Sequence, residues 1–99
     1  MNGEVSVFLT PAAERSCKKL PPPVYDFVLN EIVVLMRKNP LVGEPLAPPL
    51  QPLRSFHFKV AGQKYRVAYV FEASMRRIII HFAGYRGNFY ERLRRLLGR

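Results

Sequence analysis

Two short stretches in the second half of the chain carry basic side chains at every second position. His57 and Lys59 alternate with aromatic residues in the first stretch, and Lys64 and Arg66 do so in the second. Side chains two positions apart in a β-strand lie on the same face. The alternation therefore predicts a sheet face with clustered cations and one imidazole. Such a face could bind phosphate and exchange protons near neutral pH.

A short glycine-containing turn separates the two stretches and makes them a predicted β-hairpin. A turn centred on residues 62–63 would place Lys59 opposite Arg66, whereas one centred on residues 61–62 would place His57 there. Either register leaves all three side chains on one face. Facing like charges destabilise a sheet by a few tenths to about 1 kcal/mol. A fold that keeps such a cluster favours an anionic ligand over a merely solvated face.

A further cation lies between the last predicted strand and the last predicted helix. Arg86 stands in a loop flanked by Gly84 and Gly87, and Tyr90 follows near the start of the helix. Glycines allow tight backbone turns, and a helix N-terminus offers free N–H groups to a phosphate. A guanidinium can hold a phosphate through two hydrogen bonds, and a tyrosine ring can stack on a base. We expect both side chains to belong to the same site.

The distribution of charge points to a polyanionic partner. Residues 51–99 hold 11 basic and two acidic side chains, while residues 1–50 hold five of each, so the second half carries the whole formal net charge of +9. A basic face of this kind is typical of proteins that bind RNA or DNA. We expect additional RNA contacts from four side chains near the candidate site: Lys64, Tyr85, Arg92 and Arg95.

Neither a metal site nor a cofactor is expected. His57 and His81 have no carboxylate or thiolate at ligand spacing, and no phosphate-binding loop or dinucleotide fingerprint is present. Cys17 is the single cysteine, so it cannot form an internal disulfide, and we expect it to be buried on a helix in a cytoplasmic protein. No apolar run approaches the roughly 18 residues of a membrane span.

The 99 residues predict one domain, spanning 1–99, of the α+β class. We expect a small, antiparallel-rich sheet of about four strands, an N-terminal αα-hairpin and a C-terminal helix, with the helices on one sheet face. Asn88 and Glu91 resemble a capping box at the last helix, and Phe82 alternates in phase with Ile78 and Ile80. The predicted order is strand 4–9, helices 11–20 and 22–38, a proline-rich connector 40–52, strands 54–60, 64–71 and 76–82, and the last helix.

Three segments together resemble the RelE/ParE superfamily of toxins from type II toxin–antitoxin pairs. They are Phe-His-Phe-Lys at 56–59, Gly-Gln-Lys-Tyr-Arg-Val-Ala-Tyr at 62–69, and Gly-Tyr-Arg-Gly-Asn-Phe-Tyr at 84–90. The resemblance extends over nearly the full chain. It implies a compact sheet with two N-terminal helices and a terminal helix.

The resemblance also implies one of two activities, ribosome-dependent mRNA cleavage as in RelE-like toxins or gyrase poisoning as in ParE-like toxins. RelE-like toxins use a metal-free basic site that Arg66, Arg86 and Tyr90 match, and Lys59 matches a lysine on the preceding strand. His57 stands where other members carry another lysine. The expected protein is therefore an endoribonuclease, an mRNA interferase that inhibits translation, with a cognate antitoxin and ribosome-bound mRNA as partners.

Cleavage of RNA through its own 2′-OH requires a proton acceptor, a proton donor and stabilisation of the anionic phosphorane. We assign proton transfer to His57 and Lys59 without fixing its direction, charge stabilisation to Arg66 and Arg86, and base orientation to Tyr90. Two alternatives remain at this point. The chain could be a ParE-like inhibitor of DNA gyrase, or a non-catalytic module that binds antitoxin or nucleic acid.

Overall fold

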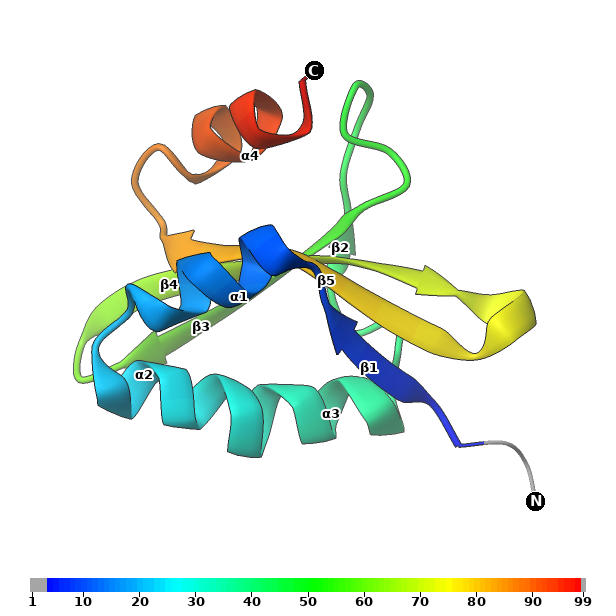
Figure 1. The fold of residues 1–99 in the computed structure, drawn as a ribbon, viewed down its shortest axis with the longest axis horizontal. Helices are drawn as coiled ribbons and strands as arrows, with labels where there is room; N and C mark the ends of the chain where they lie inside the picture. The colour runs from blue at the N-terminus through cyan, green and yellow to red at the C-terminus, as the bar shows by residue number, and fades with distance from the viewer. Residues whose placement is uncertain (1–3, 99) are drawn as a thin grey trace.

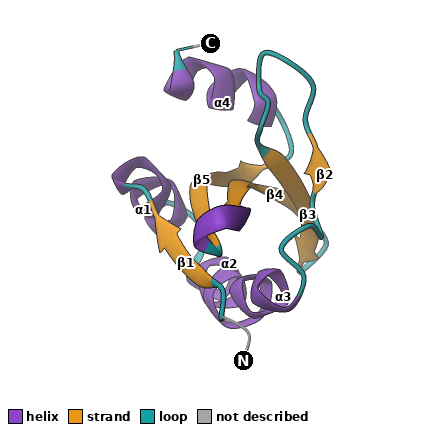
Figure 2. Cartoon of the chain, turned by 90° about the vertical axis from the view of Figure 1, so that its right-hand side faces the viewer, coloured by secondary structure: helices purple, strands orange, loops and turns teal. Residues whose placement is uncertain are grey.

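The computed structural model describes residues 4–98 and contains a five-stranded mixed sheet with helices on both faces (Figures 1 and 2). The strand order is β1-β5-β4-β3-β2, in which β1 runs parallel to β5 and the other neighbours are antiparallel. The predicted α+β class and antiparallel-rich sheet are confirmed. The strands are β1 (Ser6–Leu9), β2 (Glu44–Pro45), β3 (Arg54–Val60), β4 (Gln63–Glu72) and β5 (Arg77–Tyr85).

The strand that the sequence did not predict is β2, inside the proline-rich connector. Glu44 and Pro45 pair with Ser55 and Arg54 at the edge of β3. A two-residue strand is too short to show an alternating pattern, and proline is tolerated at a sheet edge because no neighbour needs its missing N–H. The connector is thus a part of the sheet as well as a link to it.

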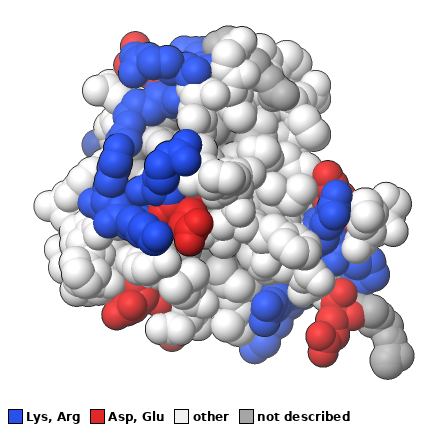
Figure 3. Space-filling view, viewed as in Figure 1, with Lys and Arg blue, Asp and Glu red and all other residues white. Residues whose placement is uncertain are grey.

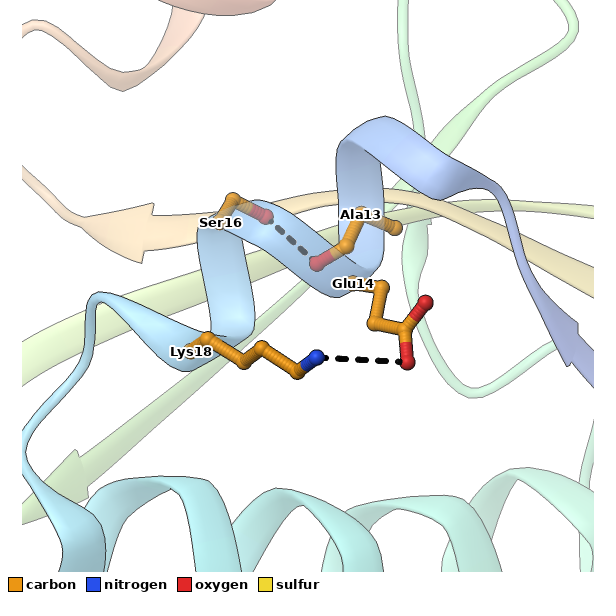
Figure 4. Close-up of polar contacts among 4 residues, drawn as sticks. All are labelled: Ala13, Glu14, Ser16 and Lys18. Carbon is orange, nitrogen blue, oxygen red and sulfur yellow. Dashed lines mark hydrogen bonds and ion pairs between the residues drawn. The ribbon is translucent and has the colours of Figure 1, made fainter.

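Helix α1 (Pro11–Lys18) begins as the sequence predicts. The Thr10 hydroxyl accepts a hydrogen bond from the Ala13 N–H at 3.0 Å, with proline at the first helical position. Ser16 Oγ donates to the Ala13 carbonyl at 2.8 Å (Figure 4) and accepts from the Ala83 N–H of β5 at 3.2 Å. This buried serine therefore links α1 to β5 by hydrogen bonds. The exposed Lys18–Glu14 ion pair in Figure 4, at 3.7 Å, contributes little to stability.

The second predicted helix is continuous, as α2 (Pro22–Phe27), a π-helical turn (Val28–Ile32) and α3 (Val33–Lys38). Its buried row recurs every four residues: Val24, Val28, Ile32 and Met36. The apolar pattern of the segment 22–38 predicts that Leu35 shares this inward stripe with Val24, Val28, Ile32 and Met36, and that expectation is wrong, since the Leu35 side chain is exposed. The wider π-helical turn keeps the four-residue row against the sheet and leaves position 35 outside it.

Cys17 on α1 is buried as expected, and burial, together with the charge of Glu14, raises the pKa of its thiol to about 11.

The sheet has a separate core on each face. Odd-numbered β4 residues such as Val67 and Tyr69 pack with α1, α2 and α3, while Ala68 and Val70 lie on the other face, in the core that includes α4 (Phe89–Leu97). Figure 2 shows α4 across the sheet from α2 and α3. The expectation that all helices share one face is therefore wrong. When a strand has apolar residues on both faces, helices can pack on either side of the sheet. The sequence pattern did not determine which face each helix covers.

A β-bulge in β5 explains why one strand serves both cores. Tyr69 of β4 pairs with Ile80, but the preceding Ala68 pairs with Phe82, so His81 is an extra residue in β5. The extra residue reverses the alternation. Ile80 stays in the α1–α3 core, whereas Phe82 enters the α4 core and lies 5.2 Å from Phe89, centroid to centroid. The predicted common face for these two β5 side chains is wrong for that reason.

The hairpin between β3 and β4 has the second of the two registers considered above. Ala61 and Gly62 both have positive φ, at 52° and 82°, as a two-residue turn of type I′ requires. His57 consequently lies opposite Arg66, and Lys59 lies opposite Lys64.

The connector is held to the sheet by one buried phenol. Tyr69 is fully buried, and its hydroxyl accepts from the Gly43 N–H at 2.8 Å and donates to the Pro40 carbonyl at 2.9 Å. Gly43 has no room for a side chain, because a Cβ there would lie 2.8 Å from the Tyr69 ring. Burial raises the pKa of this phenol, with opposing contributions from the Gly43 N–H and Arg54.

We expect Tyr69→Phe to lower the free energy of unfolding by about 1–3 kcal/mol, because it leaves the buried Gly43 N–H without its acceptor. Urea unfolding followed by circular dichroism would measure the change. Tyr25→Phe on α2 is the matched control and should change stability little, since Tyr25 is only half-buried. Equal stability of the two variants would contradict this account of the connector.

Candidate functional site

The candidate site lies on the sheet face that α4 covers only in part. Gly84 of β5, Arg66 of β4 and His57 of β3 are neighbours in one row across the sheet. Gly84 has no side chain, so no side chain covers this row at β5. The Arg92 guanidinium of α4 lies above Gly84, 3.4 Å from the position that a Cβ of residue 84 would take. The predicted pairing of an imidazole with a cationic neighbour is therefore present.

Helix α4 brings Tyr90 onto this row. The Arg66 guanidinium lies 4.9 Å from the centre of the Tyr90 ring, and the Tyr90 hydroxyl lies 3.5 Å from His57 Nε2. The same hydroxyl donates a hydrogen bond to Ser55 Oγ at 3.3 Å. The helix is held there by Phe89, which is buried against Phe82. His57, Arg66 and Tyr90, which the sequence places far apart, thus meet at one point.

The same face is hollowed next to this point. A depression of about 290 Å³ is lined by His57, Lys59, Lys64, Arg66 and Arg86, together with parts of the adjoining strands. Four of these five side chains are cations, so the depression suits an anion of roughly phosphate or nucleotide size. The two remaining predicted catalytic residues, Lys59 and Arg86, therefore share a cavity with His57 and Arg66.

The loop before α4 positions Arg86, though not by the expected cap. The Arg86 N–H donates to the Lys64 carbonyl at 3.0 Å, which extends the β4–β5 pairing by one step. Asn88 has φ of 58° and makes no side-chain cap to α4. The predicted capping box with Glu91 is wrong, because a left-handed Asn88 turns its side chain away from the first helical N–H groups.

The four predicted RNA-contact residues do not form one group. Lys64 lies in the depression, and Arg92 lies over the Phe82 ring at 4.9 Å. Tyr85 lies on the opposite sheet face, stacked on Tyr65 at 4.9 Å, but lines a second depression of about 380 Å³ with Lys64 and Arg86. Arg95 is exposed in the last turn of α4 and does not line either depression.

Many of the cations form one band on the face of the molecule drawn in Figure 3, while others lie apart from it. Figure 3 shows Lys and Arg side chains in a band that runs from α4, past the loop between β5 and α4, to the level of α1. Among the described residues, Lys18 pairs with Glu14 and Arg77 pairs with Glu72. Those pairs leave the charge of Arg66 and Arg86 available to a ligand.

Two site residues were missed by the sequence interpretation. Ser55 is buried two positions before His57 on the same face, and Glu44 pairs with Ser55 from β2. A serine in an alternating strand gives no distinct signal, and Glu44 enters the site only through the unpredicted strand. Partial burial lowers the pKa of His57, Arg66 lowers it further, and Glu44 opposes both by raising it. Across residues 4–98 no cluster of three or more potential ligands for a metal ion was found.

The sequence matches a known family over most of its length. The model of the ParE-like toxins of type II bacterial toxin–antitoxin systems matches residues 7–94. The chain belongs to this family. The resemblance seen in the three sequence segments is therefore confirmed, and the protein is a toxin of the RelE/ParE superfamily. No curated protein sequence matches the chain.

Solved structures with a fold similar to that of this ParE-like toxin include RelE toxins and their complexes. The toxin–antitoxin complex RelBE2 of Mycobacterium tuberculosis is 27% identical with a TM-score of 0.71, over 84% of this chain and 92% of that one. A free mutant of Escherichia coli RelE has a TM-score of 0.70 at 12% identity, covering 89% and 90%. The archaeal RelE–RelB complex of Pyrococcus horikoshii has a TM-score of 0.55 at 18% identity, covering 84% and 96%. The last two likenesses concern the fold alone.

The electrostatics around His57 predict opposite effects for two neutralising substitutions. Arg66→Gln should raise the pKa of the imidazole, because it removes a positive neighbour, and Glu44→Gln should lower it, because it removes a negative one. Titration of the imidazole signals by NMR would measure both. In the native protein we expect a midpoint below the usual 6.5. Shifts of the same sign in the two variants would refute this arrangement of charges.

Proposed function

We propose that this toxin is an endoribonuclease that cleaves mRNA on the ribosome through the RNA's own 2′-hydroxyl. The observation that carries the proposal is the meeting of His57, Arg66 and Tyr90 beside a cationic depression, with contacts of 3.5 and 4.9 Å. An imidazole, guanidinium groups and a cavity of phosphate or nucleotide size are the parts that this reaction requires.

The reaction is an exchange of one P–O bond for another. The 2′-oxygen loses its proton to a base and attacks the neighbouring phosphorus, which forms an anionic phosphorane. The bond from phosphorus to the 5′-oxygen then breaks, and an acid protonates the leaving oxygen. The products are a 2′,3′-cyclic phosphate and a 5′-hydroxyl. No group outside the RNA has to supply the nucleophile.

The geometry supports a division of labour among the site residues. His57 and Lys59 exchange the two protons, since both line the depression and carry titratable nitrogens. Arg66 and Arg86 stabilise the phosphorane from the same cavity. Arg66 already covers one face of the Tyr90 ring, so Tyr90 acts by orienting Arg66 and His57, and a base has access only to the remaining part of the ring.

We further propose a cognate antitoxin with an acidic segment as the regulatory partner. Two of the related structures are complexes of a toxin with its antitoxin. The second half of this chain has a large excess of positive charge, and complementary charge would speed association and shield the site. Dependence on the ribosome and action in the cytoplasm rest on the resemblance to RelE-like toxins.

The direct test is incubation of the purified chain with ribosomes and a defined mRNA, with DNA supercoiling by gyrase as a parallel assay. Cleavage of the mRNA with gyrase unaffected supports the proposal. Inhibition of gyrase with intact mRNA would overturn it in favour of the ParE-like activity that the family's name suggests.

Removal of one phosphate-binding cation should abolish toxicity without unfolding the protein. We expect Arg86→Ala to slow cleavage about 100-fold, because it removes one charge contact to the phosphorane. Arg86 is exposed in a loop, so its side chain contributes little to the core. Arg37→Ala, which removes the same charge from the exposed end of α3, is the matched control and should cleave normally. Equal rates for the two variants would exclude Arg86 from the site.

The chemistry of the cut ends tests the identity of the nucleophile. We expect a 2′,3′-cyclic phosphate, or the 3′-phosphate formed from it, and no cleavage of an mRNA whose target nucleotide carries a 2′-O-methyl group. Mass spectrometry of the products would identify the ends. A 3′-hydroxyl end would show that water or another group attacks the phosphorus, and the proposed mechanism would then be wrong.

A further inference from the structure

We infer that Ser55 is a positioning residue that determines which nitrogen of the His57 ring carries the proton. The catalytic meaning of this inference rests on the proposed ribonuclease activity. Its physical basis does not, because it concerns three side chains of the free protein: Ser55 on β3, Tyr90 on α4 and His57 on β3.

The Tyr90 hydroxyl stands between two acceptors. It lies 3.3 Å from Ser55 Oγ and 3.5 Å from His57 Nε2. A phenol has one proton and can donate it to only one of them. The acceptor that receives the proton decides whether the phenolic oxygen faces the imidazole as a donor or as an acceptor.

Burial favours donation to the serine. Ser55 is only 1% exposed, whereas His57 is exposed and can exchange hydrogen bonds with water. The recorded hydrogen bond runs from the Tyr90 hydroxyl to Ser55 Oγ, and an exposed imidazole nitrogen loses little free energy when water takes the place of the phenol as its partner. In the described part of the chain Tyr90 is the side chain that is hydrogen-bonded to Ser55. The phenol therefore donates to Ser55 and presents its lone pair to His57.

An oxygen that presents a lone pair to Nε2 favours a proton on that nitrogen. The neutral ring is then protonated at Nε2 and unprotonated at Nδ1. Nδ1 is the nitrogen that can accept the 2′-OH proton. When it does so, the ring becomes a cation that still donates from Nε2 to Tyr90, so the hydrogen bonds need no rearrangement during proton transfer.

The charged neighbours of His57 do not determine which of its two ring nitrogens carries the proton. Arg66 on β4 and Glu44 on β2 change how readily the ring is protonated. Lys59, Lys64 and Arg86 line the same depression and add to the positive potential there. These groups act on the total charge of the ring, whereas the hydrogen bond from Nε2 to Tyr90 acts on the choice between its two nitrogens.

The test is nitrogen-15 NMR of the imidazole in the free protein, at a pH where the ring is neutral. We expect the Nε2-protonated form to dominate in the native protein. In Ser55→Ala the phenol loses its buried acceptor and donates to Nε2, so the ratio of the two forms should move about tenfold toward the Nδ1-protonated ring. The amide spectrum of each variant checks that the fold is retained.

A double-mutant comparison separates this role from a merely structural one. If Ser55 acts through Tyr90, then Ser55→Ala should change the ratio in the native background and have no effect in a Tyr90→Phe background. A ratio that Ser55→Ala leaves unchanged would overturn the inference. So would a change that is equally large when Tyr90 has already lost its hydroxyl.

Cleavage measurements then connect the inference to the reaction. Ser55→Ala should slow mRNA cleavage about two- to fourfold, because a tenfold shift away from a dominant Nε2-protonated form lowers the fraction of neutral rings with a free Nδ1 by about that factor. If the NMR ratio behaves as expected but native protein cleaves no RNA, the inference about Ser55 stands and the proposed function fails. If RNA is cleaved but the ratio does not respond to Ser55→Ala, the proposed function stands and the inference fails.

Discussion

The extra residue in β5 is the constraint on which the arrangement of this protein depends. Without the bulge at His81, Phe82 would point into the α1–α3 core, and α4 would lose the aromatic ring against which Phe89 packs. Tyr90 follows Phe89 directly and therefore reaches Arg66 and His57 only because Phe89 is anchored there. The bulge in β5 thus allows Phe82 to pack in the core beneath α4, and this packing places the Tyr90 side chain at the candidate site.

The sequence predicted those features that depend on alternation along one strand. The common face of His57, Lys59 and Arg66 follows from a period of two, and the turn residues restricted the hairpin to two registers. The features that the sequence did not predict depend on a break in the alternation along a strand, or on pairing between strands that are far apart in the sequence. A bulge leaves no mark that distinguishes Phe82 from Ile80, and Glu44 reaches the site through a two-residue strand that pairing with β3 creates.

The site also shows how a sheet can hold like charges side by side. Arg66 lies over the Tyr90 ring and Arg92 over the Phe82 ring, each at 4.9 Å. Such contacts contribute about 0.5–1 kcal/mol at accessible positions, which is similar in size to the repulsion between facing cations. Aromatic rings therefore offset repulsion around Arg66 and Arg92 without neutralising their charges. A carboxylate partner would give comparable stability but would occupy the guanidinium that a phosphate needs.

The first half of the chain takes part in the site through its connector. The Tyr69 phenol holds Pro40 and Gly43 at the sheet edge, and this contact sets where Glu44 lies. Glu44 is a negative charge beside a surface that is otherwise cationic, and it raises the pKa of His57 against two lowering effects. Cations alone would lower the pKa of the imidazole further, because they disfavour its charged form. The nearby carboxylate limits this lowering, and the proposed proton transfer calls for an imidazole that can both take up and release a proton.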